Sequence, residues 1–242
     1  MSRDAPIVVS PPTAETGLAR IRRRMVSAAV AAGRDPGTLT LLAVSKGQPI
    51  DALRDLLRQG QRAFGENYVQ EALPKIAALR GEDLSWHFIG RLQSNKTREV
   101  ATHFSWVHSL DRLRLAERLS AQRPDHLAPL DCCIEVNLNQ EASKSGIDLP
   151  AVAALVAAID RLPRLRLRGL MGMPAPQADP ARARASFAAL RDCLATSGGA
   201  LDTLSMGTSA DFEAAITEGA TLVRIGTALF GPRLPRGTVP EG

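Results

Sequence analysis

The stretch TLTLLAVSKGQPIDALRDLLRQG, residues 38–60, holds one complete unit of the pattern that decides the fold. An apolar run rich in β-forming residues covers Leu39–Ser45, and a pattern of helical period follows it and closes on Gly60. This order predicts a buried strand and then a helix. Lys46 stands at the end of that strand, although the chain has only four lysines in 242 residues.

The same order of strand and then helix recurs along the chain. Eight strands are predicted, near Leu39–Ser45, Arg62–Gly65, Trp86–Gly90, Trp106–Ser109, Leu130–Asn137, Leu167–Met171, Leu201–Met206 and Leu222–Ile225. Since no hairpin signal joins two neighbouring strands, the pattern favours a parallel sheet. Eight strands is the number that closes an α/β barrel of the TIM (β/α)8 type, and a doubly wound open sheet is the alternative.

A further helix is predicted before the first strand. Leu18, Ile21 and Met25 recur at helical spacing, Thr13 is a suitable N-cap, and Gly33 is a suitable stop. The chain length suits one barrel of this type. We therefore expect a single domain over residues 1–242, with a core of about 13–233 and flexible ends.

The composition is that of an ordinary globular protein. Hydrophobic residues make up 45% and charged residues 23% of the chain, and no apolar run approaches the roughly 18 residues that a membrane span needs. The first residues lack the long apolar region of a secretory signal. We therefore expect a cytoplasmic protein that makes no membrane contact.

Nucleic-acid and metal sites are both disfavoured. The net charge of +5 arises from scattered arginines, and only 4% of residues are aromatic, so stacking platforms for nucleic acid are not expected. Cys132 and Cys133 are adjacent and Cys193 stands alone, which does not match the spacing of metal ligands. The cysteines are predicted to be small buried residues, and no metal is expected.

Lys46 is placed where the chemistry of such a barrel occurs. Active sites lie at the carboxyl ends of the strands, and Lys46 follows the first predicted strand directly. In a largely closed barrel mouth the neutral amine becomes more accessible and can attack a carbonyl carbon. Schiff-base chemistry is therefore predicted. The alternative is a lysine that only extends past the strand end into solvent.

Two loops near the far end of the chain predict an anion site. SMGTSADFEAAITEG closes strand seven and VRIGTALFG closes strand eight, and barrels commonly bind phosphate between these loops. Thr208 or Ser209 is predicted to begin a helix with Asp211 as its capping partner, so exposed amides there attract an anion. Gly226 permits close approach of the backbone, and Thr227 adds a hydroxyl. Each motif alone is compatible with ordinary capping.

A phosphorylated aldehyde would satisfy both ends of this site. Its carbonyl would meet Lys46, and its phosphate would meet Ser209 and Gly226–Thr227. Pyridoxal 5′-phosphate (PLP) is the common cofactor of that shape. Arg224, near the end of strand eight, would then donate a hydrogen bond to the ring nitrogen and leave that nitrogen unprotonated, which makes the ring a weak electron sink. An ion pair at the barrel mouth is the other interpretation of Arg224.

Seven motifs resemble those of one known family. They run in order from about Thr38 to Pro232 and read LLAVSK, AFGENYVQEAL, WHFIGRLQSNK, EVNLNQEASKSGI, LRGLMGMPAP, LSMGTSADFEAAI and VRIGTALFG. They are similar to the YggS/PROSC group, the pyridoxal phosphate homeostasis proteins. The group often has Met-Gly-Met-Ser where this chain has Met206–Ser209, which replaces an apolar side chain with the Thr208 hydroxyl and keeps the serine.

The resemblance implies a fold, a cofactor and a role. The fold would be a single barrel like the N-terminal domain of bacterial alanine racemase, with PLP held as a Schiff base on Lys46. Phosphate contacts would come from Ser209, Gly226 and Thr227, and a ring-nitrogen contact from Arg224. Members of the group are thought to buffer or deliver PLP rather than to turn over a substrate, which implies apo-enzymes as partners.

Other polar residues have weaker signals. Asn67 follows strand two and could contact the cofactor, and Met171 ends strand six and could line its ring, although turn formation and packing explain them equally well. His87 lies within strand three and is expected to be a core histidine. Lys96 and Lys144 lie in polar segments and are candidates for a second PLP site, with a solvated loop as the alternative.

Three other functions compete with that of a PLP carrier. A PLP-dependent racemase of low activity would need a second proton-transferring group, and the chain's one tyrosine, Tyr68, follows strand two. A Schiff-base aldolase usually carries its lysine on a later strand. A regulator that acts through its surface would present a long apolar helix face, which the sequence lacks. Since no lid domain is evident, a monomer is expected.

Overall fold

The computed structural model describes residues 15–138, 145–174 and 180–231, and in them the predicted strands form one closed parallel barrel. The barrel follows the order of the chain, with strands β1 (Thr40–Val44), β2 (Ala63–Glu66), β3 (Ser85–Phe88), β4 (Trp106–Leu110), β5 (Leu130–Val136), β6 (Leu165–Gly172), β7 (Thr203–Ser205) and β8 (Leu222–Ile225). Because β1 pairs with both β2 and β8, the barrel has no open edge. The (β/α)8 prediction is confirmed, and the open-sheet alternative is wrong.

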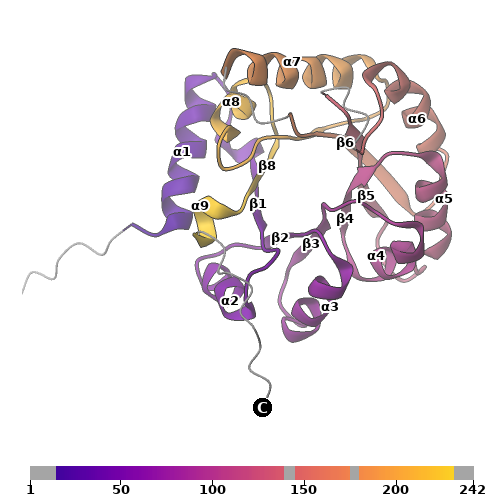
Figure 1. Cartoon of the computed structure of the whole chain (residues 1–242), viewed down its shortest axis with the longest axis horizontal. Helices are drawn as coiled ribbons and strands as arrows, with labels where there is room; N and C mark the ends of the chain where they lie inside the picture. Colours follow the sequence, from indigo (N-terminus) through magenta and orange to yellow (C-terminus); the bar gives the residue numbers. More distant parts are fainter. Residues whose placement is uncertain (1–14, 139–144, 175–179, 232–242) are drawn as a thin grey trace, which may run out of the picture.

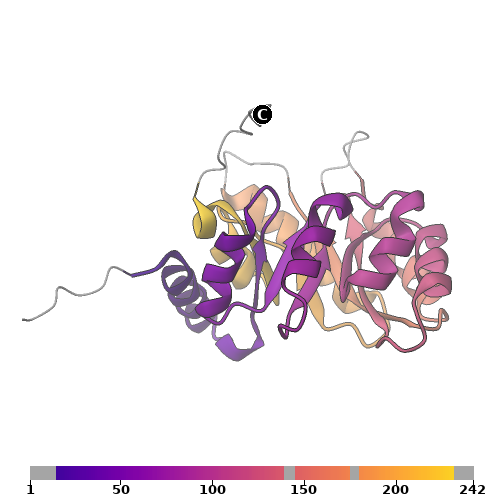
Figure 2. The ribbon, with the colours of Figure 1, turned by 90° about the horizontal axis from the view of Figure 1, so that it is seen from below.

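Helices surround the barrel (Figure 1). They are α1 (Gly17–Ala31), α2 (Ile50–Arg58), α3 (Val69–Ala78), α4 (Thr97–His103), α5 (Leu113–Gln122), α6 (Val152–Ile159), α7 (Pro180–Thr196), α8 (Phe212–Thr217) and α9 (Thr227–Phe230). The side view shows a short cylinder, with α9 beyond the carboxyl end of β8 (Figure 2). Helix α4 is short, with seven residues, and it buries only Thr97, Val100 and Ala101.

The predicted N-terminal helix is confirmed as α1, which packs against α8 and α9. Its first turn is capped by Thr16, whose hydroxyl accepts a hydrogen bond from the Ala19 amide at 3.2 Å. Thr13, the predicted cap, lies outside the described residues. Arg24 fixes the helix to α8 through a 2.9 Å ion pair with Glu213. The first helix of the chain therefore packs beside the last helices, which follow β7 and β8.

The strands are buried on both faces, as expected for a parallel sheet covered by helices. Cys132 and Cys133 illustrate this burial, because they are adjacent in β5 and neither is exposed. Burial raises the pKa of both thiols. Some barrel residues are polar and equally buried, among them His108 and Ser205. His108 and Ser205 are hydrogen-bonded to each other, and Ser205 is also bonded to Arg224.

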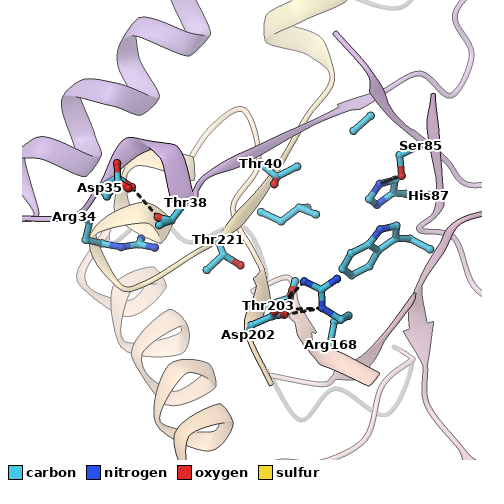
Figure 3. A pocket seen from close by; sticks show the side chains of 13 residues that line it. Arg34, Asp35, Thr38, Thr40, Ser85, His87, Arg168, Asp202, Thr203 and Thr221 are labelled. Carbon is cyan, nitrogen blue, oxygen red and sulfur yellow. Dashed lines mark hydrogen bonds and ion pairs between the residues drawn. The ribbon is translucent and has the colours of Figure 1, made fainter. Parts of the chain in front are cut away.

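The barrel has a cavity at each end. The larger, of about 680 Å³, lies at the amino end, because it is lined by residues that open strands, including Thr40, Ser85 and Thr203 (Figure 3). The smaller lies at the carboxyl end, where such barrels carry their active sites.

Two expectations concern the chain as a whole. None of the helices in the described residues is long and apolar enough to cross a lipid bilayer. The single domain over 1–242 stays a prediction, because residues 1–14 and 232–242 lie outside the described ranges.

Candidate functional site

The cavity at the carboxyl end of the barrel brings together the residues predicted from sequence. Its volume is about 330 Å³, within the range of small-molecule sites. It is lined by all the predicted site residues, namely Lys46, Asn67, Met171, Ser209, Arg224, Gly226 and Thr227. They follow, or lie near the ends of, five strands from the two halves of the chain: β1, β2, β6, β7 and β8.

Lys46 occupies a tight turn directly after β1. The Gln48 amide donates to the Ser45 carbonyl at 3.1 Å, so residues 45–48 form a β-turn with Lys46 and Gly47 at its centre. Gly47 has a φ of +71°, a conformation that residues with a Cβ rarely adopt. The glycine that follows the lysine in the sequence is therefore required by the turn that carries the lysine.

This turn is hydrogen-bonded to a cluster of charged side chains from β2 and α3. The cluster consists of Glu66, Glu71 and Lys75, and we call it the Lys75 cluster. Lys75 Nζ donates to the Ser45 carbonyl and to Glu66 Oε1, at 2.8 Å each, and to Glu71 Oε1 at 2.7 Å. Glu71 Oε1 also accepts from the Gly47 amide. The residues on both sides of Lys46 are thus bonded to this cluster.

Sequence reasoning missed the Lys75 cluster. Lys75 is only 7% exposed, and Ser45 Oγ donates to Glu66 Oε1 at 2.6 Å within the same cluster. Burial raises the pKa of Glu66, while the hydrogen bonds from Lys75 and Ser45 oppose that rise. The four-residue spacing of Glu71 and Lys75 on α3 was the available signal, although exposed helix pairs show the same spacing.

Arg224 lines the cavity and has N–H donors left over from its hydrogen bonds to the protein. Its Nη1 donates to the Ser205 carbonyl at 2.6 Å and to Ser205 Oγ at 2.8 Å, and its Nη2 donates to the Gly172 carbonyl at 3.2 Å. A guanidinium has five N–H groups, so two remain without a partner among the described residues. Burial lowers the Arg224 pKa to about 10, which leaves the group protonated at neutral pH.

The loop after β7 differs from the prediction in its detail. The Thr208 amide donates to Asp211 Oδ1 at 2.6 Å, and α8 begins only at Phe212. The predicted capping contact between Thr208 and Asp211 is confirmed. The predicted helix start at Thr208 or Ser209 is wrong, because a turn over residues 209–211 precedes the helix. Ser209 Oγ accepts from the Ala228 amide at 3.4 Å, and so joins the loop after β7 to the first turn of α9.

Gly226 leaves space on the cavity wall. A Cβ added there would lie no closer than 3.5 Å to any other group, and that group is the Val44 carbonyl. The packing of the protein itself therefore does not require a glycine at this position. Thr227 follows directly and also lines the cavity.

Asn67 and Glu135 complete the polar lining. Asn67 Oδ1 is buried and has no hydrogen-bond partner among the described residues, an arrangement that a bound donor would satisfy. Glu135, which sequence reasoning missed, accepts from Ser145 Oγ at 3.3 Å, and burial raises its pKa. Met171 supplies a buried apolar wall at the end of β6.

Several other candidates lie elsewhere. His87 lines the amino-end cavity, and Tyr68 is 58% exposed and is not among the residues that line the carboxyl-end cavity. Lys96 lies 3.7 Å from Glu99 and lines a neighbouring depression with Asn67. Lys144 lies outside the described residues.

Comparison with known proteins identifies the family. The family model "Alanine racemase, N-terminal domain" matches residues 18–234. A protein of Pseudomonas aeruginosa named "Pyridoxal phosphate homeostasis protein" is 57% identical over 221 residues, which are 91% of this chain and 96% of that protein. The chain belongs to the pyridoxal phosphate homeostasis protein family.

Two further proteins are similar to this chain over most of their length. The Escherichia coli K12 protein of the same name is 52% identical over 225 residues, which are 89% of this chain and 95% of that protein. The structure of PipY from Synechococcus elongatus PCC7942, solved with PLP bound, has a TM-score of 0.77 and 38% identity. It covers 87% of this chain and 100% of the PipY chain.

Proposed function

We propose that this protein binds PLP as a Schiff base on Lys46 and takes part in intracellular vitamin B6 homeostasis. One observation carries the proposal. The Lys46 side chain, the unused donors of Arg224 and the hydroxyls of Ser209 and Thr227 belong to one cavity. An amine, a ring-nitrogen donor and phosphate donors are what PLP requires of a binding site.

The residues present fit the cofactor. Lys46 would bond covalently to the aldehyde carbon, and Arg224 would donate to the ring nitrogen through an N–H group that has no other partner in the described residues. The unpaired Oδ1 of Asn67 would accept from the ring hydroxyl. Ser209 and Thr227 would bind the phosphate, and Gly226 leaves room for it.

Arg224 favours retention of the cofactor over turnover. Bound PLP supplies an electron sink for carbanion chemistry, and the sink is strongest when a carboxylate keeps the ring nitrogen protonated. Arg224 stays protonated itself at neutral pH, so it acts as a donor and leaves the ring nitrogen without a proton. A reversible covalent bond at an accessible cavity suits buffering of PLP or its delivery to apo-enzymes.

Names of relatives support this role. Curated relatives are named pyridoxal phosphate homeostasis proteins, and the PipY structure contains PLP. We further propose, as expected from the sequence, a cytoplasmic monomer that transfers PLP to PLP-dependent apo-enzymes. Transfer to an apo-enzyme, followed by the gain of that enzyme's activity, would test the delivery step.

The experiment that tests the binding proposal is borohydride reduction of the PLP-loaded protein, followed by mass spectrometry. We expect the pyridoxyl group on the peptide that contains Lys46, and loss of the visible absorbance in Lys46→Ala. Lys96→Ala is the matched control and should keep both signals. A pyridoxyl group on Lys96 or Lys144 instead would contradict the proposal and would indicate a second site.

A racemase of low activity is the alternative function. It would need a second group to deliver a proton, and Glu135 is a carboxyl that lines the cavity with a raised pKa. Tyr68 is exposed and does not line the cavity. Steady conversion of L-alanine to D-alanine by the loaded protein, with loss of that activity in Glu135→Gln, would favour the racemase over the carrier.

A further inference from the structure

A line of hydrogen-bonded side chains crosses the barrel interior. Ser85 Oγ lies 2.9 Å from His87 Nε2, and His87 Nδ1 lies 2.9 Å from His108 Nε2. His108 Nδ1 lies 2.8 Å from Ser205 Oγ, which is 2.8 Å from Arg224 Nη1. We call Ser85, His87, His108 and Ser205 the histidine chain.

The histidine chain joins the two cavities of the barrel. Ser85 and His87 line the amino-end cavity, where Figure 3 shows them side by side on β3. His108 and Ser205 are fully buried in the interior, and Arg224 lines the carboxyl-end cavity. The polar groups are therefore continuous from one mouth of the barrel to the other.

The chemistry of Arg224 fixes the direction of these hydrogen bonds. A guanidinium only donates, so Ser205 Oγ accepts from Arg224 and is left with its own proton to donate. His108 Nδ1 is its partner and must then accept, which places the His108 proton on Nε2. By the same step His87 accepts at Nδ1 and donates from Nε2 to Ser85. The opposite direction would leave the Ser205 hydroxyl proton without a partner among the described residues.

The environment holds both imidazoles neutral and in place. Burial lowers the pKa of His87 to about 3, and burial together with the nearby His87 and Arg224 lowers that of His108 well below its usual value. The His87 ring stacks on Trp106 with a centroid distance of 5.2 Å and an interplanar angle of 4°. Each ring therefore carries one proton, and the His87 ring has a fixed plane.

We propose that the histidine chain is a positioning device for Arg224. Its hydrogen bonds run in one direction from Arg224 to Ser85 and hold Nη1 of the guanidinium, so that the two remaining N–H groups stay in the carboxyl-end cavity. The proposal rests on the function proposed above for the identity of the ligand. The bond directions themselves belong to the protein without any ligand.

The first test uses the cofactor-free, full-length protein. Histidine labelled with ¹⁵N reports by NMR which ring nitrogen carries the proton. We expect His87 and His108 to be Nε2–H tautomers that do not titrate between pH 8 and pH 6, because burial lowers the pKa of both rings. An Nδ1–H tautomer at either position would overturn the proposal.

The second test uses the PLP-loaded protein. His108→Leu removes the link, and His108→Gln keeps one acceptor and one donor. We expect His108→Leu to shift the visible absorbance maximum and to release PLP on the order of threefold to tenfold faster, as loss of one hydrogen bond predicts. His108→Gln should restore both values in part, and His103→Leu should change neither.

A second, smaller substitution covers the case in which His108→Leu does not fold. Ser205→Ala removes the chain's bond to the Arg224 side chain and leaves the Ser205 carbonyl as an acceptor. If His108→Leu does not fold, the absorbance maximum and the PLP release rate of Ser205→Ala test the proposal in its place. Folded variants with the wild-type spectrum and release rate would overturn the proposal. If the wild-type protein attaches no PLP to Lys46, the proposed function fails. The NMR measurement of the His87 and His108 tautomers then remains as the test of the histidine chain.

Discussion

Lys75 donates a hydrogen bond from Nζ to the backbone carbonyl of Ser45, 2.8 Å away and one residue before Lys46. The same ammonium binds Glu66 and Glu71, and Glu71 accepts from the Gly47 amide. A buried lysine on α3 therefore holds the turn that presents a second lysine to the carboxyl-end cavity. Lys75 thus bonds directly to the backbone before Lys46 and, through Glu71, to the backbone after it.

Replacement of Lys75 by methionine should destabilise the protein and slow PLP attachment. The side-chain volume is nearly kept, but Glu66 is left as an uncompensated buried carboxylate, which typically costs about 3–5 kcal/mol of unfolding free energy. The turn at Lys46 also loses an anchor. Denaturant titration of the cofactor-free protein and the rate of absorbance change after PLP addition measure the two effects.

The pH dependence of Lys75→Met separates this cause from simple packing loss. Burial raises the folded-state pKa of Glu66, and the loss of the Lys75 hydrogen bond removes an opposing influence. The folded variant then binds a proton more tightly than the unfolded chain does. Its loss of unfolding free energy relative to the wild type should therefore be larger at pH 8 than at pH 5. Lys96→Met is the control, since a partly exposed pair contributes at most about 1 kcal/mol. A deficit that does not vary with pH would contradict the assignment to Glu66.

The buried histidines should make the protein sensitive to acid. The folded-state pKa of His87 lies near 3 and that of His108 lies well below normal, whereas both titrate near 6.5 when unfolded. The stability they contribute is therefore fully present above pH 6.5. It is lost as the pH falls toward 3, by up to about 1.4 kcal/mol per pH unit for each histidine.

Comparison with a variant isolates the histidine contribution from that of the carboxyls. Glu66 and Glu135 have raised pKa values and act in the opposite direction, because they favour the folded state as the pH falls. We expect the double variant His87→Gln, His108→Gln to lose less stability than the wild type between pH 7 and pH 5. Parallel curves for the two proteins would show that the histidines are not buried in the neutral form.

The barrel itself was predictable because its strands are short apolar runs buried on both faces. Predicted and observed strands agree to within a few residues, and β8 was placed at Leu222–Ile225 in both. α4 gives little local signal, because Thr97–His103 is short and has no clear apolar stripe. The turn before α8 was missed because Asp211 can cap a helix or stabilise a turn, and only the folded backbone decides between them.

For the candidate site, the sequence predicts which residues share the cavity wherever strand order alone brings them together. Lys46, Arg224 and Thr227 meet because each ends or follows a strand of one closed barrel. The bond between Lys75 and Ser45 depends on how α3 docks against the barrel, which no local pattern encodes. The histidine chain likewise depends on side-chain directions inside the barrel.

Gly226→Ala should separate ligand binding from folding. An added Cβ would meet only ordinary contacts with Val44, so we expect the free energy of unfolding of the cofactor-free protein to change by no more than about 1–2 kcal/mol. The methyl group would occupy space that we assign to the phosphate. The affinity for PLP should therefore fall at least about tenfold, a change of about 1.4 kcal/mol.

Two controls make this prediction specific to the phosphate. Pyridoxal has the same ring and aldehyde without the phosphate, so its binding should be nearly equal in the wild type and in Gly226→Ala. Gly207→Ala should instead destabilise the fold, because Gly207 has a φ of +90° and its Cβ would lie 2.7 Å from the Ala215 Cβ. If Gly226→Ala weakened PLP and pyridoxal equally, the phosphate would not lie against Gly226, and the orientation proposed for PLP in the cavity would be wrong.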